Sequence, residues 1–266
     1  MKIGFVGGGT MAEAIIGAVL SGRVAAPEEI VVGEPLPQRR EALAERYKIN
    51  VTADNAKAAR GAEIVVLAVK PNQFGAVAAS LAAHLKPRQT VVSIMAGVTL
   101  QRLHDDLQHE AVVRVMPNMP AQVGEGMSVW TAAPEVADDA REKVRRMLQT
   151  AGREAYFEEE RFIDMATAVS GSGPGFVFLL IEAFIDGAVH LGLSREAARE
   201  LVVQTFLGSA RLAQETGRPV SELRALVTTP GGTTAEGLLV LEEAGLRAAI
   251  TEALIATYEK SKALGG

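Results

Sequence analysis

The strongest constraint on this chain lies at its start, where a short apolar run enters a glycine-rich turn. Residues 2–6 read Lys-Ile-Gly-Phe-Val, and Gly7-Gly-Gly-Thr-Met-Ala12 leads into an apolar pattern of helical period. This is the G-x-G-x-x-G/A spacing in its strand–turn–helix context, where Gly7 permits the tight turn and Gly9 lets the backbone approach a pyrophosphate. The pattern predicts an NAD(P) site. An ordinary strand-to-helix turn and a nucleotide-like ligand such as S-adenosylmethionine are the alternatives.

The composition is that of a globular chain with one or two domains. Of its 266 residues, 48% are hydrophobic and 22% are charged, and the formal net charge is −5. With that charge and no basic, aromatic-rich stretch, we expect no nucleic-acid partner. The absence of cysteine excludes disulfides, thiolate catalysis and cysteine-ligated zinc.

The apolar segments favour a cytoplasmic protein over a secreted or membrane-bound one. The first apolar run is interrupted by Gly7–Gly9 and Glu13, which is atypical of a signal peptide. The longest apolar stretch, residues 176–193, contains Glu182 and Asp186 and is better interpreted as a buried helix than as a membrane span. We therefore expect no membrane partner and a cytoplasmic location.

The first part of the chain alternates strand and helix signals. Strands are predicted at residues 2–6, 30–32, 50–52, 62–69, 90–94 and 111–115, with helices between them. A segment at 127–131, a helix at 135–151 and a strand at 154–157 could extend this sheet. The run 62–69 is apolar throughout except for Glu63, as expected for a strand buried on both faces. This alternation predicts an α/β fold with a Rossmann-like, doubly wound parallel sheet.

After about residue 160 only helix signals remain. Helices are predicted at residues 162–169, 174–191, 195–215, 220–226, 234–243 and 246–262. We therefore predict a dinucleotide-binding domain at 1–158 and a helical domain at 159–266. The helix 176–191 is apolar nearly all round and must be buried. A partner subunit or the chain's own sheet could cover it.

Three turns are rich in glycine or hydroxyl groups. Ala68-Val-Lys-Pro71 follows a buried strand, at the sheet edge where such folds bind ligands, although Pro71 would also suit a plain helix start. In Ser170-Gly-Ser-Gly-Pro174, the proline occupies the expected first helical position. In Thr228-Thr-Pro-Gly-Gly-Thr-Thr234, Thr233 and Glu236 have the spacing of a capping box.

The last of these turns has a second interpretation, because a helix N-terminus with hydroxyl groups suits a substrate carboxylate. We expect no metal site, since none of the four histidines has metal-ligand spacing with a carboxylate partner. The residues alone thus indicate an NAD(P)-dependent oxidoreductase with a helical second domain and a small anionic substrate.

These turns, taken in order, resemble the pyrroline-5-carboxylate reductase family over essentially the whole chain. The resemblance rests on residues 5–11, 68–71, 92–97, 114–120, 170–174 and 229–234. It implies hydride transfer from NADH or NADPH to the imine carbon of 1-pyrroline-5-carboxylate, which gives L-proline at the end of proline biosynthesis. It also implies self-association, because in this family the helical domains of two subunits interlock.

The resemblance assigns site residues as well. It implies cofactor contacts at Gly7, Gly8, Gly9, Thr10, Met11, Ala12, Asn55, Ala68, Val69, Lys70, Pro71, Met95, Ala96 and Gly97. It implies substrate contacts at Ser172, Gly173, Gly231, Gly232, Thr233 and Thr234, with Thr234 and Ser170 as the catalytic hydroxyls.

One position departs from the family. The second strand is followed by Glu34, where many members carry serine, threonine or asparagine and prefer NADPH. An acidic residue there normally binds the adenosine 2′-hydroxyl and repels a 2′-phosphate. Arg39 and Arg40 follow closely and could still hold a phosphate, so the choice between NADH and NADPH stays open.

Two other functions are compatible with the glycine turn. One is another β-hydroxyacid dehydrogenase-like oxidoreductase, a group that generally relies on a lysine in the helical domain. Residues 176–193 contain no lysine, which disfavours it. The other is a redox sensor that binds NAD(P)H without turnover. The intact turns at 170–174 and 229–234 disfavour a sensor, which needs no substrate pocket.

Overall fold

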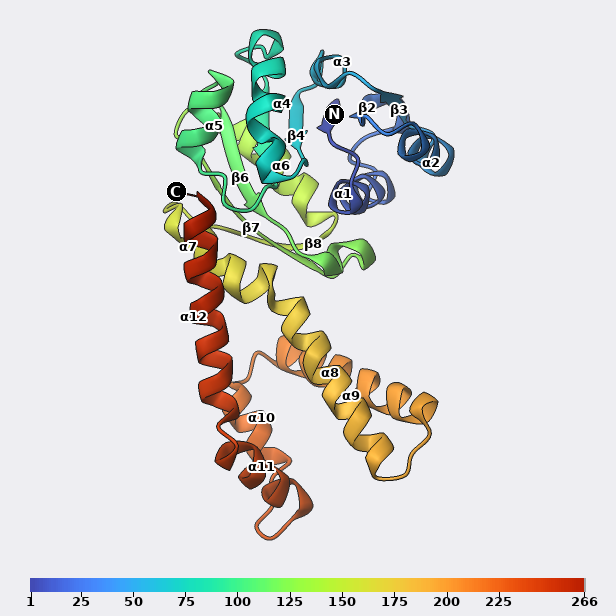
Figure 1. Ribbon diagram of the computed structural model, residues 1–266, viewed down its shortest axis with the longest axis vertical. Coiled ribbons are helices and arrows are strands. Elements are labelled where there is room, and N and C mark those ends of the chain that lie inside the picture. The colour runs from blue at the N-terminus through green and yellow to red at the C-terminus, as the bar shows by residue number, and fades with distance from the viewer. Residues whose placement is uncertain (266) are drawn as a thin grey trace. The chain divides into compact units, whose positions relative to one another are not determined.

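The structure is a computed structural model that describes residues 1–265 (Figure 1). Its contacts divide the chain into two compact units. The first contains residues 1–172 and the described residues from 256 onward, and the second contains residues 173–255.

The first unit is built on a single sheet. Within the described residues its eight strands are β1 (Ile3–Val6), β2 (Ile30–Gly33), β3 (Asn50–Thr52), β4 (Ile64–Leu67), β5 (Thr90–Ser93), β6 (Val112–Met116), β7 (Gly126–Ala132) and β8 (Gly152–Tyr156). Their spatial order is β3-β2-β1-β4-β5-β6-β7-β8, and the first six strands are parallel. This confirms the predicted Rossmann-like sheet. The extension differs, because β7 runs antiparallel to β6 while β8 is parallel to β7.

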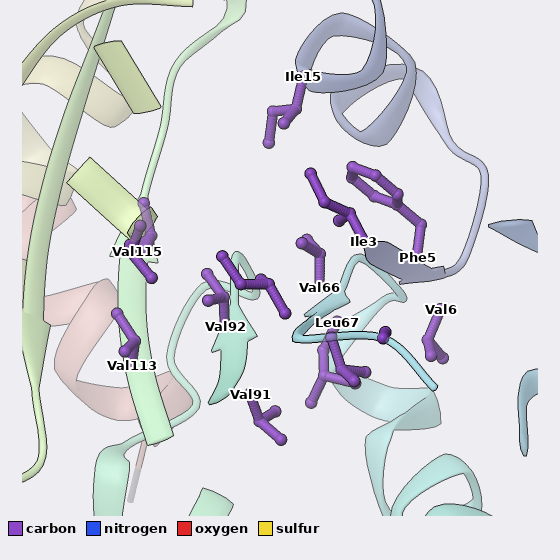
Figure 2. Close-up of a cluster of buried hydrophobic side chains, with 14 of the residues drawn as sticks. Ile3, Phe5, Val6, Ile15, Val66, Leu67, Val91, Val92, Val113 and Val115 are labelled. Atoms are coloured by element: carbon purple, nitrogen blue, oxygen red, sulfur yellow. The ribbon is translucent and has the colours of Figure 1, made fainter. Parts of the chain in front are cut away.

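Helices and central strands enclose an apolar core. The helices of this unit are α1 (Thr10–Ser21), α2 (Pro37–Tyr47), α3 (Asn55–Ala59), α4 (Phe74–Leu81), α5 (Leu100–Leu107), α6 (Asp138–Gln149) and α7 (Arg161–Ala166). Figure 2 shows side chains from β1, β4 and β5 in one cluster with Ile15 of α1. Every residue of β4 is buried, as its continuous apolar run predicted.

The strand register determines where a ligand can bind. β1 lies between β2 and β4, and Val6 is aligned with Gly33 on one side and with Leu67 on the other. The chain leaves β1 toward β2 and β3 and then crosses back to β4, so the strand order reverses at β1. Ligands of doubly wound sheets bind at this point, beyond the carboxyl ends of the strands.

A buried arginine joins the first helix after the sheet to the strands. Arg114 on β6 is 2% exposed, and its guanidinium donates to the carboxylates of Glu160 (2.8 Å) and Asp164 (2.7 Å). The Ser261 hydroxyl also donates to Asp164 (2.9 Å). These bonds join α7 to the sheet, and the first unit extends to residue 172, whereas the predicted boundary at residues 158–159 follows the end of the strand signals in the sequence.

The second unit is helical, as predicted. It contains α8 (Gly173–His190), α9 (Arg195–Thr216), α10 (Val220–Leu226), α11 (Thr233–Glu243) and the first part of α12 (Leu246–Gly265). α8 and α9 pack together, with the rings of Phe184 and Phe206 edge to face at 5.3 Å.

The apolar helix α8 is not covered by the other helices of the second unit. None of its residues is buried, and Phe178 and Leu179 are 56% and 63% exposed. The helices of the second unit therefore leave the apolar surface of α8 exposed. The helical run Arg161–His190 is also long and apolar enough to cross a membrane by length and composition, a test that core helices of soluble proteins also pass.

Candidate functional site

A pocket of about 790 Å³ lies where the strand order reverses. It is lined by Gly7, Gly9, Glu34, Pro35, Leu36, Asn55, Ala68, Val69, Lys70, Asn72, Gln73, Ala76, Val77 and Ser80. The sheet register brings these segments together, because the residues after β1, β2 and β4 leave the same edge. Seven of the predicted cofactor residues line this one pocket: Gly7, Gly9, Glu34, Asn55, Ala68, Val69 and Lys70.

The glycine turn forms one wall of the pocket. Gly7 has φ +98°, and a Cβ placed on it would lie 2.7 Å from the carbonyl oxygen of Ala68. Both observations exclude a side chain there. At Gly9, in contrast, no heavy atom of residues 1–265 lies within 4 Å of an added Cβ, apart from those of Gly9 and its two chain neighbours. Packing within the chain therefore does not require glycine at this position, whereas the close approach of a ligand would.

The amino terminus of α1 adds an electrostatic component. Gly9 is the N-cap of this helix and has no side chain to bond the amides of the first turn. Unpaired N–H groups and the positive end of the helix dipole favour a phosphate at such a position. Ala12 is buried, in agreement with its predicted role of packing the helix onto the strand.

Asn55 carries an unsatisfied polar atom. It begins α3, and the Asp54 side chain caps that helix by accepting from the N–H groups of Ala56 (2.9 Å) and Lys57 (3.3 Å). The Asn55 Oδ1 is buried and has no hydrogen-bond partner among the described residues. Such an acceptor costs roughly 1–3 kcal/mol. Asn55 lines the pocket, and a bound ligand whose hydroxyl group reached this oxygen would satisfy it.

The loop after β4 approaches the pocket as predicted. The Ala68 N–H donates to the carbonyl oxygen of Val6 (2.8 Å), which extends the β1–β4 pairing by one residue. Pro71 then begins a short 3-10 helix, Pro71–Gln73. The predicted helix start is therefore confirmed, and Ala68, Val69 and Lys70 line the pocket, while ligand binding by this loop stays a prediction.

Other predicted cofactor residues lie outside the pocket lining. Met95 is buried, and Gly97 packs so closely on α12 that an added Cβ would lie 2.7 Å from the Leu264 Cβ. Neither they nor Ala96 line the pocket. Thr10 lines a different hollow of about 630 Å³ along α1, together with residues such as Glu13.

Ser170 lies in a π-helical turn, Thr167–Gly171, and not in the open turn that its glycine neighbours predicted. Its hydroxyl donates to the Ala166 carbonyl (3.0 Å). Its own carbonyl accepts from the Asn118 side chain (3.0 Å), whose Oδ1 accepts from the Met127 N–H (2.8 Å). In the sequence Asn118 stands between Pro117 and Pro120, and no local pattern there indicates these bonds. π-turns occur frequently at functional sites.

The predicted capping box at Thr233 is wrong. The N-cap of α11 is Gly232, which has an extended backbone with φ −80° and ψ 161°. The helix therefore begins one residue earlier than predicted, Thr233 is its first residue, and Glu236 is displaced from the position that a capping box requires. Within residues 1–265 the side chains of Thr233 and Thr234 are exposed and make no hydrogen bond.

The predicted residues thus fall into two groups. The cofactor residues, with Ser170 and Ser172, belong to the first unit. Gly173, Gly231, Gly232, Thr233 and Thr234 belong to the second unit. Pro174 is the second residue of α8, close to the first helical position that its ring geometry predicted.

Family models match both parts of the chain. A model described as pyrroline-5-carboxylate reductase dimerisation matches residues 160–264. A second, described as NADP oxidoreductase coenzyme F420-dependent, matches residues 2–97.

Full-length relatives agree with these matches. The chain is 44% identical over 265 residues to a pyrroline-5-carboxylate reductase of Synechocystis, with 100% of this chain and 98% of the relative covered. It superposes on a Coxiella burnetii pyrroline-5-carboxylate reductase with a TM-score of 0.92 at 35% identity, over 100% of this chain and 98% of the other. A Plasmodium falciparum pyrroline carboxylate reductase with NADP bound gives a TM-score of 0.91 at 32% identity, with the same coverage.

Proposed function

The chain belongs to the pyrroline-5-carboxylate reductase family, and we propose that the pocket at the ends of β1, β2 and β4 holds its nicotinamide cofactor. The enzyme reduces the C=N bond of 1-pyrroline-5-carboxylate to give L-proline, using NADH or NADPH. The similarity that carries this conclusion extends over the whole chain, including both units.

The cofactor residues of this proposal surround one edge of the sheet. Gly7, Gly8, Gly9, Thr10, Met11 and Ala12 would hold the phosphates, with Glu34, Asn55, Ala68, Val69, Lys70 and Pro71 toward the riboses and Met95, Ala96 and Gly97 toward the nicotinamide. Two features support this fit. Among the described residues, nothing fills the space beside Gly9 and the buried Asn55 Oδ1 has no hydrogen-bond partner.

The reaction requires little acid–base catalysis by the protein's own side chains. When bound, the reduced cofactor supplies the hydride that the imine carbon accepts. An imine can arrive already protonated near neutral pH, so the chain's part is to position the two reactants and exclude water. In our proposal, Ser172, Gly173 and residues 231–234 bind the substrate, while Thr234 and Ser170 contact its ring nitrogen. The Ser170 hydroxyl donates to Ala166, which leaves its oxygen able to accept from a protonated imine.

Thr234→Ala is expected to lower kcat/KM for 1-pyrroline-5-carboxylate by about tenfold, because a lost contact worth about 1.4 kcal/mol in the transition state has that effect. Binding of NADH alone should be unchanged, since the phosphate turn belongs to the other unit. Steady-state kinetics and cofactor titration measure both effects. Thr228→Ala is the matched control, because the Thr228 hydroxyl is already bonded to the Arg224 carbonyl (2.7 Å). Full activity in Thr234→Ala would remove this residue from the mechanism.

We also propose that the enzyme is a cytoplasmic homodimer, or a larger oligomer of dimers, with α8 covered by a second subunit. The dimerisation model matches the region that contains α8, and the helix exposes Phe178 and Leu179. Lipid is a poor alternative because Glu182 and Asp186 lie in the middle of the helix, and each carboxylate would cost about 2.5–3.5 kcal/mol in a bilayer centre.

Replacing Leu179 with aspartate should therefore dissociate the oligomer. Sedimentation at low micromolar concentration is expected to show a dimer or larger for the parent and a smaller species for Leu179→Asp, because a charge in an apolar interface lacks a partner. Val123→Asp is the control, since Val123 is 77% exposed but lies in the first unit. A well-folded, active parent monomer would contradict the proposal.

One assay tests the activity itself. Purified enzyme is mixed with NADH or NADPH and with 1-pyrroline-5-carboxylate as the sole acceptor, and cofactor oxidation is followed together with proline formation. Turnover with stoichiometric proline is expected. Cofactor binding without turnover would instead favour the redox sensor.

A further inference from the structure

The carboxylate that follows β2 is held firmly in the wall of the cofactor pocket. Glu34 is 8% exposed. Its Oε2 accepts from the Gly8 N–H (3.0 Å), and its Oε1 accepts from the Leu36 N–H (3.0 Å). Turning the side chain out of the pocket would break both bonds. Glu34 therefore presents a negative charge next to the glycine turn that would hold the pyrophosphate.

The two arginines of α2 that could offset this charge have other partners. Arg39 donates through Nε to the Gly8 carbonyl (2.6 Å), and its guanidinium pairs with Glu13 of α1. Arg40 donates to the backbone carbonyls of Glu34 (2.7 Å) and Pro35 (2.8 Å). Neither guanidinium bonds to the Glu34 carboxylate, so both act as supports of the turns around the pocket.

The partner of Arg39 is ionised at neutral pH. Burial alone would raise the pKa of Glu13, but the hydrogen bond and charge of Arg39, with those of Tyr47 and Arg46, lower that pKa below its ordinary value of 4.5. The Glu13 carboxylate also accepts from Arg46 at 2.9 Å. The ion pair with Arg39 thus persists across the physiological pH range and holds that arginine on α1.

From this arrangement we propose that Glu34, with Arg39 and Arg40 both engaged elsewhere, makes this enzyme bind NADH in preference to NADPH. The inference rests on the proposed cofactor pocket. A ribose 2′-hydroxyl can donate to the Glu34 carboxylate, whereas a 2′-phosphate would bring a second negative group toward a charge that cannot move away. Sequence reasoning left this choice open because either arginine could have served the phosphate.

The test is the binding of each cofactor without substrate. Titration of the parent enzyme, followed by calorimetry or by protein fluorescence, should give a Kd for NADH that is lower than that for NADPH by about tenfold or more. Glu34→Gln removes the charge at nearly constant size and should reduce this ratio by about tenfold, mainly through tighter NADPH binding. Thermal unfolding with and without each cofactor provides a second measure of the same preference.

Glu41→Gln is the matched control. Glu41 lies on α2, is exposed, and makes no hydrogen bond or ion pair among residues 1–265, so its variant loses the same unit charge away from the pocket. Its cofactor ratio should equal that of the parent. Equal affinities of the parent for NADH and NADPH, or an unchanged ratio in Glu34→Gln, would overturn the inference.

A different result is expected if the proposed cofactor site is wrong. If the parent binds neither cofactor, the proposed cofactor site is wrong and the question of preference does not arise. If Glu34→Gln does not fold, Glu34→Ser replaces it with a small neutral side chain, and the parent's own ratio still decides. A parent that binds NADPH more tightly contradicts the proposal even when the pocket and the activity are correct.

Discussion

Gly9→Val is expected to weaken the binding of both NADH and NADPH by about a hundredfold or more, the equivalent of about 2.7 kcal/mol. The valine side chain would occupy the open space beside the turn, where the backbone must approach the pyrophosphate. The fold should survive, because no described residue beyond the chain neighbours lies within 4 Å of the added Cβ and the backbone at Gly9 (φ −68°, ψ −178°) is open to any residue. Cofactor titration measures the loss.

A graded series separates this effect from damage to the helix. Gly9→Ala adds only one methyl group and should bind the cofactor with intermediate affinity. Valine is a poor N-cap and could cost α1 about 1 kcal/mol, so thermal unfolding of each variant is measured alongside binding. If Gly9→Val binds cofactor as tightly as the parent does, the phosphates do not lie at this turn.

Arg114→Met should lower the free energy of unfolding by an amount on the order of 3 kcal/mol. The arginine is almost fully buried and is bonded to Glu160 and Asp164, so its removal leaves two partly buried carboxylates without their cation. The same bonds join α7 to β6, close to the π-helical turn that carries Ser170. Urea unfolding measures the change.

Two controls identify the cause of this destabilisation. Arg88→Met removes the same charge from an exposed position with no ion pair among the described residues and should have little effect. Combining Arg114→Met with Glu160→Gln and Asp164→Asn removes the uncompensated charges and should restore much of the lost stability. A single Arg114→Met variant as stable as the parent would show that the ion pairs contribute nothing net.

Local sequence patterns were sufficient for most of the elements. Residues 64–69 are continuously apolar because β4 is buried on both faces, and the alternation of such runs with helical patterns requires crossover connections and hence a parallel sheet. The direction of the strand that pairs with β6 could not be predicted from such local patterns. The residues of β7 suit a buried strand of either direction, so its antiparallel pairing with β6 was not predictable from them.

The residues of the site also divide into those that could be predicted from the sequence and those that could not. Gly7, Glu34 and Ala68 each follow a strand, and parallel register alone brings them to one edge. The Thr233 error arose because capping spacing is a local signal, while the backbone of Gly232 determines where α11 begins. Asn118 shows the converse, since its bonds to Ser170 and Met127 link residues far apart in the chain.

The sequence by itself determined the order of strands and helices, the glycine turn and the family, because each depends on residues close together in the chain. Only the tertiary structure decided which charged side chains are bound to other groups of the chain and which one lines the pocket. Arg39 and Arg40 look equally able to bind a phosphate in the sequence, yet in the fold they bond to Glu13 and to backbone carbonyls, while Glu34 lines the pocket. Hydrogen bonds and ion pairs depend on distances between atoms that only the packing of α1, α2 and β2 establishes.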